Sequence, residues 1–273
     1  MANVLVQRSG NLLTTELLRL YDGYVDGFRG ADGELPAMMR LKRVHTGCVV
    51  KNAELIADGE KFDADTREAA LAAALLHDTG RYEQLRLYNT FRDSDSVDHA
   101  VFSHDIVKEK GWLEMAFADA RTRDAVLKAV LYHNRREIPS GLDVLAETCS
   151  HVVRDADKLD IFRVLEDQVA HTDWRSDSRA FWNLAVSAPP NPTVIDCIER
   201  RQPVDYQHIK SLSDFVLIQI GWMISGLHFA TSRRLCRERG HLEFRRGFLH
   251  KLTDDSSIDR VCDAARSALE SLV

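Results

Sequence analysis

Apolar residues recur every three to four positions along most of the 273-residue chain, and this spacing constrains the fold more than any other feature. It places apolar side chains on one face of an α-helix. Strand-like alternation of apolar and polar residues is not convincing anywhere, and hairpin turn signals are few. The sequence therefore predicts an all-α fold, a helical bundle with additional helices toward the C-terminus.

Helix boundaries can be placed from start and stop signals. Asp65 and Ser96 are the expected N-terminal caps of two helices, and Gly80 is the expected stop of an alanine-rich helix. We expect helices over about 15–28, 36–59, 65–79, 96–110, 118–134, 142–168, 213–240 and 257–272.

The domain organisation follows from the one clear break in this pattern. Residues 176–192 are polar, small and proline-containing, which is typical of a loop or of a boundary between two helical parts. We expect residues 1–273 to form a single all-helical domain. Its core would span about 35–165, and a C-terminal helical extension would span about 190–273.

Composition excludes several classes of protein. The formal net charge is −6, so the chain lacks the basic field that long phosphate backbones require, and nucleic acid is not an expected main partner. The five cysteines contain no C-x-x-C pair, which argues against a disulfide framework. Neither a signal peptide nor an apolar run of about 18 residues is visible. We therefore expect a cytoplasmic protein without a membrane partner; the oligomeric state is not predicted.

Four of the eleven histidines and two aspartates lie within or at the ends of apolar helix faces. They are His45, His77, Asp78, His99, His133 and Asp157. Neutral imidazole and carboxylate are good ligands for divalent first-row metals. A carboxylate in an apolar helix also needs a partner, because burying it alone is costly.

Helix geometry leaves two choices open among these ligands. Asp155 lies two positions before Asp157, about 200° around the helix, so the two cannot easily bind the same ion. His104 follows His99 by five residues, about 140° around the helix, and competes with it for the same role.

The adjacent pair His77-Asp78, with a histidine upstream and an aspartate downstream, resembles the signature of the HD superfamily of metal-dependent phosphohydrolases. LLHDTGR is similar to the family's HD-x-G-K/R segment, and RDADKLD to its A-D-x-L segment. His99 and His133 match the two extra histidines of the dinuclear subgroup. The resemblance covers about 35–165, implies an HD-domain helical bundle, and selects Asp157 and His99 over their competitors.

The resemblance implies that His45, His77, Asp78 and Asp157 hold one divalent ion. Asp78 would also bridge to a second ion held by His99 and His133. A water or hydroxide between the ions would attack phosphorus in line. Manganese, iron, magnesium, zinc, nickel and cobalt all remain possible, as one ion or two.

Three cationic residues are candidates for contact with the substrate phosphate. Arg81 could pair with it bidentately, Lys158 is a weaker candidate, and Arg135 follows the ligand His133. Asp160 could orient a ligand or water. Together with Asp78, Arg81 and Lys158 form the expected catalytic set.

The expected function is hydrolysis of a phosphate ester in a nucleotide or another small phosphorylated metabolite. Two alternatives remain open. The same pattern resembles the dinuclear-iron HD subgroup of oxygenases, and the chain could instead be a catalytically silent, nucleotide-sensing regulatory module.

Overall fold

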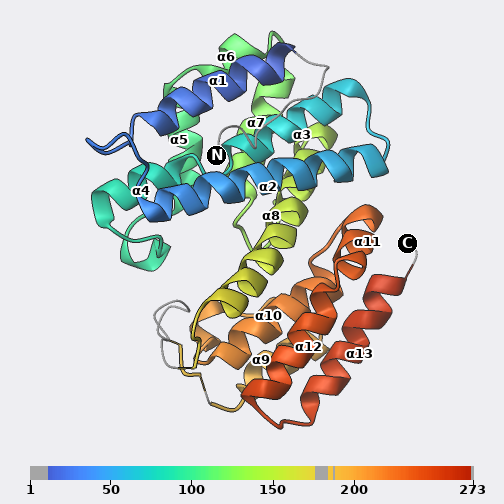
Figure 1. Ribbon diagram of the computed structural model, residues 1–273. Coiled ribbons are helices and arrows are strands. Elements are labelled where there is room, and N and C mark those ends of the chain that lie inside the picture. The colour runs from blue at the N-terminus through green and yellow to red at the C-terminus, as the bar shows by residue number, and fades with distance from the viewer. Residues whose placement is uncertain (1–11, 176–183, 187, 272–273) are drawn as a thin grey trace. The chain divides into compact units, whose positions relative to one another are not determined.

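The computed structural model describes residues 12–175, 184–186 and 188–271, and these residues are almost entirely helical or in connecting turns (Figure 1). Their one β feature is an isolated bridge between Ala185 and Ser211. The all-α prediction is therefore confirmed. The helices are α1 (Leu12–Asp26), α2 (Ala37–Gly59), α3 (Ala64–Leu76), α4 (Gly80–Tyr88), η1 (Asp93–Asp95), α5 (His99–Glu109), α6 (Trp112–Ala116), α7 (Ala120–Tyr132), α8 (Val144–His171), α9 (Pro192–Glu199), η3 (Tyr206–His208), α10 (Leu212–Ser225), α11 (Ala230–Glu238), α12 (His241–Leu252) and α13 (Ser257–Glu270).

The chain forms two compact units, residues 1–157 and 158–273, whose boundary lies within α8. The sequence suggested a boundary some 20 residues later, around 176–192, where the composition changes; 176–183 and 187 lie outside the described residues. That the whole chain folds as one domain stays a prediction. In the part of the chain that the structure describes, no helix has the length and apolar character needed to cross a membrane.

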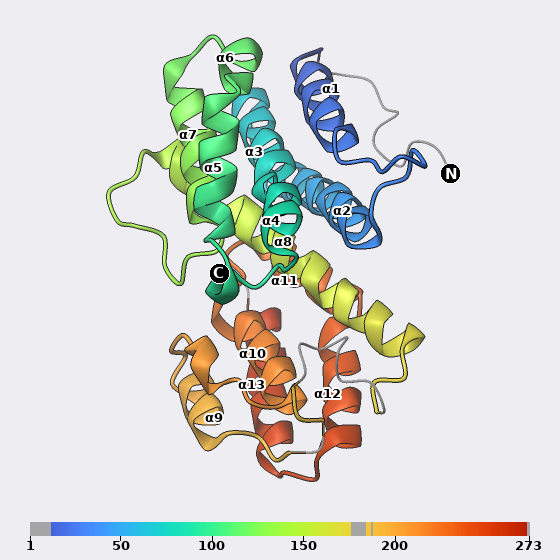
Figure 2. The same ribbon diagram turned by 90° about the vertical axis from the view of Figure 1, so that its left-hand side faces the viewer.

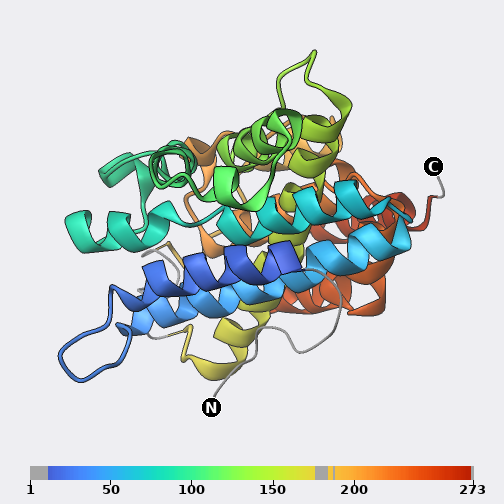
Figure 3. The ribbon, with the colours of Figure 1, turned by 90° about the horizontal axis from the view of Figure 1, so that it is seen from above.

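Helix α3 is the central element of the first unit. It packs between α2 and α7, and α7 in turn packs against α5 (Figure 2). Seen from above, α1 also lies against α3 (Figure 3). Every residue from Ala69 to Leu76 is buried, as expected for a helix that is apolar all round. Its small alanine side chains let the neighbouring helices approach closely.

The end of α3 places the His77-Asp78 pair between helices. Helix α3 ends at Leu76, and Gly80 begins α4 rather than stopping α3, so the predicted role of Gly80 is wrong. A Cβ atom on Gly80 would lie 2.7 Å from the backbone nitrogen of Ser103. The Gly80 N–H also donates to Ser103 Oγ at 2.9 Å. Glycine is therefore required because α4 starts in direct contact with α5.

Both predicted caps are displaced by two residues. Asp63, not Asp65, accepts from Thr66 N at 2.7 Å at the start of α3. Asp98, not Ser96, accepts from Ala100 N and Val101 N at the start of α5. Asp63 and Asp98 have extended backbone, which lets their side chains fold back onto the first turn.

In the second unit, the predicted long helix over 213–240 is two helices, α10 and α11. Helix α10 ends at Ser225, and the capping residue Gly226 follows, where an added Cβ would lie 2.9 Å from the Trp222 carbonyl oxygen.

The core of the second unit contains a fully buried arginine, Arg245. Its guanidinium donates to Gln219 Oε1, to Glu166 Oε1 and to the Phe162 carbonyl oxygen at 2.7 to 3.0 Å. Glu166 also accepts from His241 Nδ1 at 2.6 Å. A buried charge is tolerated when it is paired and hydrogen-bonded in this way.

The ionisation of Glu166 should make the second unit sensitive to acid. Burial raises the pKa of Glu166, but the His241 hydrogen bond and the Arg245 charge outweigh it and lower the pKa below its usual value. A carboxylate with a lowered pKa stabilises the fold above its unfolded pKa, and this contribution is lost as the pH falls. We expect Glu166→Gln to lower the free energy of unfolding by about 1.5–3 kcal/mol at pH 7.

The free energies of unfolding of this variant and of the native protein should differ less below about pH 4, where the carboxylate is protonated in the unfolded chain. Urea unfolding at pH 7 and pH 3.5, followed by circular dichroism, measures both values. Glu238→Gln is the control, because its pair with Arg234 is half exposed and such pairs contribute little. If Glu166→Gln lowered the free energy of unfolding equally at both pH values, the expectation would be contradicted.

Candidate metal centre

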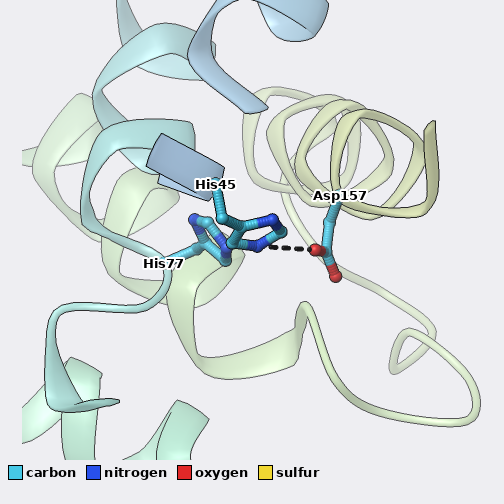
Figure 4. A group of neighbouring side chains, drawn as sticks. All are labelled: His45, His77 and Asp157. Carbon is cyan, nitrogen blue, oxygen red and sulfur yellow. Dashed lines mark ion pairs between the residues drawn. The ribbon is translucent and has the colours of Figure 1, made fainter. Parts of the chain in front are cut away.

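The structure brings all six predicted ligands together within the first unit, although they come from five separate segments. His45 lies on α2, His77 and Asp78 follow α3, His99 begins α5, His133 follows α7, and Asp157 lies on α8. They form two groups in which the candidate ligand atoms lie within 4.8 Å of one another. One group is His45, His77 and Asp157 (Figure 4), and the other is Asp78, His99 and His133.

Asp78 lies between two pairs of imidazoles. Its Oδ2 is 3.6 Å from His45 Nε2 and 3.5 Å from His77 Nε2. Its Oδ1 is 3.7 Å from His99 Nε2 and 3.9 Å from His133 Nε2. Each oxygen of one carboxylate therefore faces its own pair of nitrogen donors, which is an arrangement that could bridge two cations.

Hydrogen bonds on the far side of the rings orient the histidines. His77 Nδ1 donates to the Ala74 carbonyl oxygen at 2.8 Å, and His133 Nδ1 to the Val130 carbonyl oxygen at 2.7 Å. His99 Nδ1 lies 2.5 Å from Asp93 Oδ2. Since a carbonyl oxygen can only accept, the proton of His77 and of His133 lies on Nδ1. Their Nε2 lone pairs are then directed into the centre.

Two observations show that these donors fit a cation. His77 Nε2 is buried and has no hydrogen-bond partner, which is costly for a polar atom. His99 Nε2 and His133 Nε2 lie 3.0 Å apart, so two ring nitrogens of neighbouring imidazoles face each other. With His133 protonated on Nδ1, a positive ion between the rings would satisfy both lone pairs.

The protonation states are also those that a metal requires. Burial, followed by the neighbouring His99 and His77, lowers the pKa of His133 to about 3. Burial likewise lowers the pKa of His77. Both imidazoles are therefore neutral at ordinary pH, which is the form that binds metals.

The two carboxylates stay ionised despite their burial. Burial raises the pKa of Asp78, but nearby cations, led by Lys42, hold that pKa well below its usual range. Burial also raises the pKa of Asp157, and the hydrogen bond and charge of His45 outweigh it, so that this pKa too is lowered. His45 Nε2 lies 3.2 Å from Asp157 Oδ1 (Figure 4).

Two side chains that sequence reasoning did not single out tie the helices of the site together. Asn52 Nδ2 donates to the Ala156 carbonyl oxygen at 3.0 Å and so joins α2 to α8 next to Asp157. Arg154 donates to the carbonyl oxygens of Tyr132 and His133 and so joins α8 to the end of α7. Asn52 lies seven residues after His45, a helical spacing that could have identified it.

The structure shows where the competing residues of the two open choices lie. Among the described residues, the groups that could hold a metal contain Asp157 and His99 but neither Asp155 nor His104. His104 forms an outward pair with the exposed Asp105 at 2.8 Å. Asp155 is buried elsewhere on α8.

Arg81 is more tightly held than the sequence suggested. Its Nη1 donates to Gln84 Oε1, to the Phe91 carbonyl oxygen and to Asp93 Oδ1 at 2.7 to 2.9 Å. Its Nε lies 3.5 Å from Asp78 Oδ1. The guanidinium therefore links Asp78 to the segment around Asp93, and a bidentate grip on a phosphate would have to break these bonds.

The other predicted substrate contacts lie further out or in the second unit. Arg135 Nη1 is 2.8 Å from Asp98 Oδ2, in a half-exposed pair. Lys158 is buried and is the first residue of the second unit. Asp160, also in that unit, pairs with Arg163. The roles of Arg135, Lys158 and Asp160 stay predictions.

Lys42 and Asp93 contact the ligands, and the sequence analysis missed both. Lys42 Nζ lies 2.7 Å from Asp78 Oδ2. It precedes His45 by three residues on one helix face, which is a usable signal. Asp93 lies in the short helix η1, where no periodic pattern could have pointed to it. Asp93, Asp98 and His99 form a third group with metal-like spacing. Because Asp93 supports His99 and Asp98 caps α5, we assign them to positioning.

The fold and the site together define a helical protein whose clustered histidines and aspartates could hold divalent cations. Residues 44–161 match the family model of the HD domain, and this span contains all six candidate ligands. This part of the chain is therefore similar to the HD domain. No curated protein and no solved structure matches the chain.

The number of metal ions bound per chain should show whether each of the two ligand groups binds its own ion. We expect the native protein to bind two manganese ions per chain and His133→Ala to bind one, because only the second group loses a donor. Equilibrium dialysis with elemental analysis measures the ratio. His104→Ala should keep two ions, since His104 lies outside both groups. Unchanged stoichiometry in His133→Ala would contradict the assignment.

Asp93 should act on metal affinity through His99. Replacing Asp93 by Asn removes the charge that orients the His99 ring, and such supporting residues typically contribute 10- to 100-fold to metal affinity. We expect Asp93→Asn to lower the affinity for the second manganese ion by about that factor and to leave the affinity for the first ion unchanged. Titration calorimetry resolves the two steps. Equal weakening of both would show a general structural defect instead.

Proposed function

We propose that the protein is a metal-dependent phosphohydrolase that cleaves a phosphate ester in a nucleotide or another small phosphorylated metabolite. The observation that carries this proposal is the position of Asp78, with each of its oxygens facing a separate pair of imidazoles. Two bound divalent ions would supply an activated water near neutral pH and neutralise charge on the phosphoryl oxygens.

The residues have distinct tasks in holding these ions. His45, His77 and Asp157 would bind the first ion, His99 and His133 the second, and Asp78 would be shared. Four imidazoles with two carboxylates suit manganese, iron, cobalt, nickel or zinc better than magnesium, which prefers oxygen ligands. Because the ring hydrogen bonds already orient His77, His99 and His133, little rearrangement would be needed on binding.

Two cationic side chains beside the centre would suit an anionic substrate. Lys42 lies beside Asp78 Oδ2, and Arg81 lies beside Asp78 Oδ1. In a buried, water-poor site such fixed charges act more strongly on a phosphate than they would in water. Arg135 and Lys158 remain candidates for contacts to the rest of the substrate.

Phosphate release tests the proposal directly. Protein loaded with manganese, iron, cobalt, nickel or zinc should hydrolyse p-nitrophenyl phosphate or members of a nucleotide panel. Asp78→Asn should lower kcat/KM by about 10³-fold or more, because both ion positions lose a shared anionic ligand. His104→Ala is the control and should keep full activity.

Two results would overturn the proposal. One is the absence of phosphate release from fully metal-loaded protein across the panel. The other is substrate-dependent dioxygen consumption by the iron-loaded protein, which would assign it to the oxygenase alternative. Tight nucleotide binding without turnover would indicate the regulatory alternative.

A further inference from the structure

Lys42 reaches from α2 into the buried centre. Its side chain is 22% exposed, while the Asp78 carboxylate that it contacts is 3% exposed. Among the residues that the structure describes, Asp78 is the hydrogen-bond acceptor of Lys42, at 2.7 Å from Nζ. The ammonium also lies 5.6 Å from the centre of the Phe91 ring. Lys42 is thus a partly exposed cation whose ammonium points toward the buried Asp78 carboxylate.

The position of this ammonium conflicts with a bound ion. Asp78 Oδ2, which Lys42 contacts, is the oxygen that faces His45 and His77. A divalent cation held by these two imidazoles would need the same oxygen. Two positive charges only a few ångströms apart in a buried site repel each other strongly. Lys42 and the first ion therefore compete for Asp78.

The Lys42 side chain can adopt another position when an ion displaces it. A lysine head is a compact charge on a flexible four-carbon stem, so it can swing without moving α2. The Phe91 ring attracts a cation on its face and would keep the ammonium close to the centre. A phosphate bound over the ions would then offer the ammonium a new anionic partner.

Arg81 differs from Lys42 in this respect. It also lies near the Phe91 ring, 5.8 Å from its centre, and faces the other oxygen of Asp78. Its Nη1, however, already has three acceptors. Lys42, with one exchangeable partner, is the cation that can change partners, and Arg81 is the one that stays in place.

We propose that Lys42 exchanges anions: it neutralises Asp78 in the metal-free protein and binds a phosphoryl oxygen of the substrate once ions occupy the centre. This rests on the proposed function, because the exchange requires ions and a phosphate at this site. It assigns phosphate recognition to Lys42 on α2 rather than to Arg81, and it makes Lys42 a competitor of the first metal ion.

Removing the ammonium should have opposite effects on metal and on phosphate. In Lys42→Met the first manganese ion should bind about tenfold more tightly, because its competitor is gone and Asp78 keeps its charge. Inorganic phosphate should bind the manganese-loaded variant about tenfold more weakly or worse, because a charge-assisted contact is lost. Titration calorimetry measures both affinities without any need for turnover.

Three further variants sharpen this test. Lys42→Gln keeps the length and polarity of the side chain without its charge, and should repeat both effects if Lys42→Met fails to fold. Lys42→Arg restores a cation and should recover most of the phosphate affinity. Lys51→Met removes an exposed lysine nine residues further along α2 and should change neither affinity.

The outcomes separate this inference from the function on which it rests. The exchange is overturned if both uncharged variants bind manganese as weakly as the native protein or more weakly, or if they bind phosphate as tightly as the native protein. The proposed function still stands in that case, provided that the native protein binds both metal and phosphate. A native protein that takes up no divalent ion overturns both. Tighter manganese binding together with weaker phosphate binding supports the exchange.

Discussion

The buried carboxylate of Asp78 is the constraint on which the first unit depends. A negative charge that is 3% exposed is stable inside a helical bundle only when cations or strong donors surround it. Lys42 and Arg81 supply charge from two helices, and four imidazoles approach its two oxygens. The alanine-rich α3 makes this convergence possible, because small side chains let α2 and α7 pack closely on either side of it.

Hydrogen bonds around the candidate ligands hold their side chains in place. Backbone carbonyl oxygens hold two of the rings, and Asp93 holds the ring of His99. Asn52 and Arg154 tie α8 to the helices that carry the other ligands. Since rigid secondary structure and buried hydrogen bonds fix each donor, most of the ordering cost of binding is met during folding.

The second unit uses buried charge differently. The donors of Arg245 face acceptors on Gln219, Glu166 and Phe162, so this cluster satisfies its charge with its own residues. In the candidate metal centre, by contrast, His99 Nε2 and His133 Nε2 face each other, and four imidazoles surround the single carboxylate of Asp78. The first arrangement suits a structural role, whereas the second gathers nitrogen and oxygen donors that could hold a cation.

Local patterns in the sequence determined the helical class and the six candidate ligands, because helix periodicity is a property of neighbouring residues and the motif order is readable along the chain. Cap positions were missed by two residues, since several acidic or hydroxyl side chains compete within one turn. Only the tertiary structure decided which side chains surround the ligands. Lys42 and Arg154 contact residues 19 to 36 positions away, and the sequence around each residue does not reveal which distant partner it meets. Asp93 is closer in sequence to its partner, six residues from His99, yet it lies in the three-residue helix η1, which is too short to show a periodic pattern.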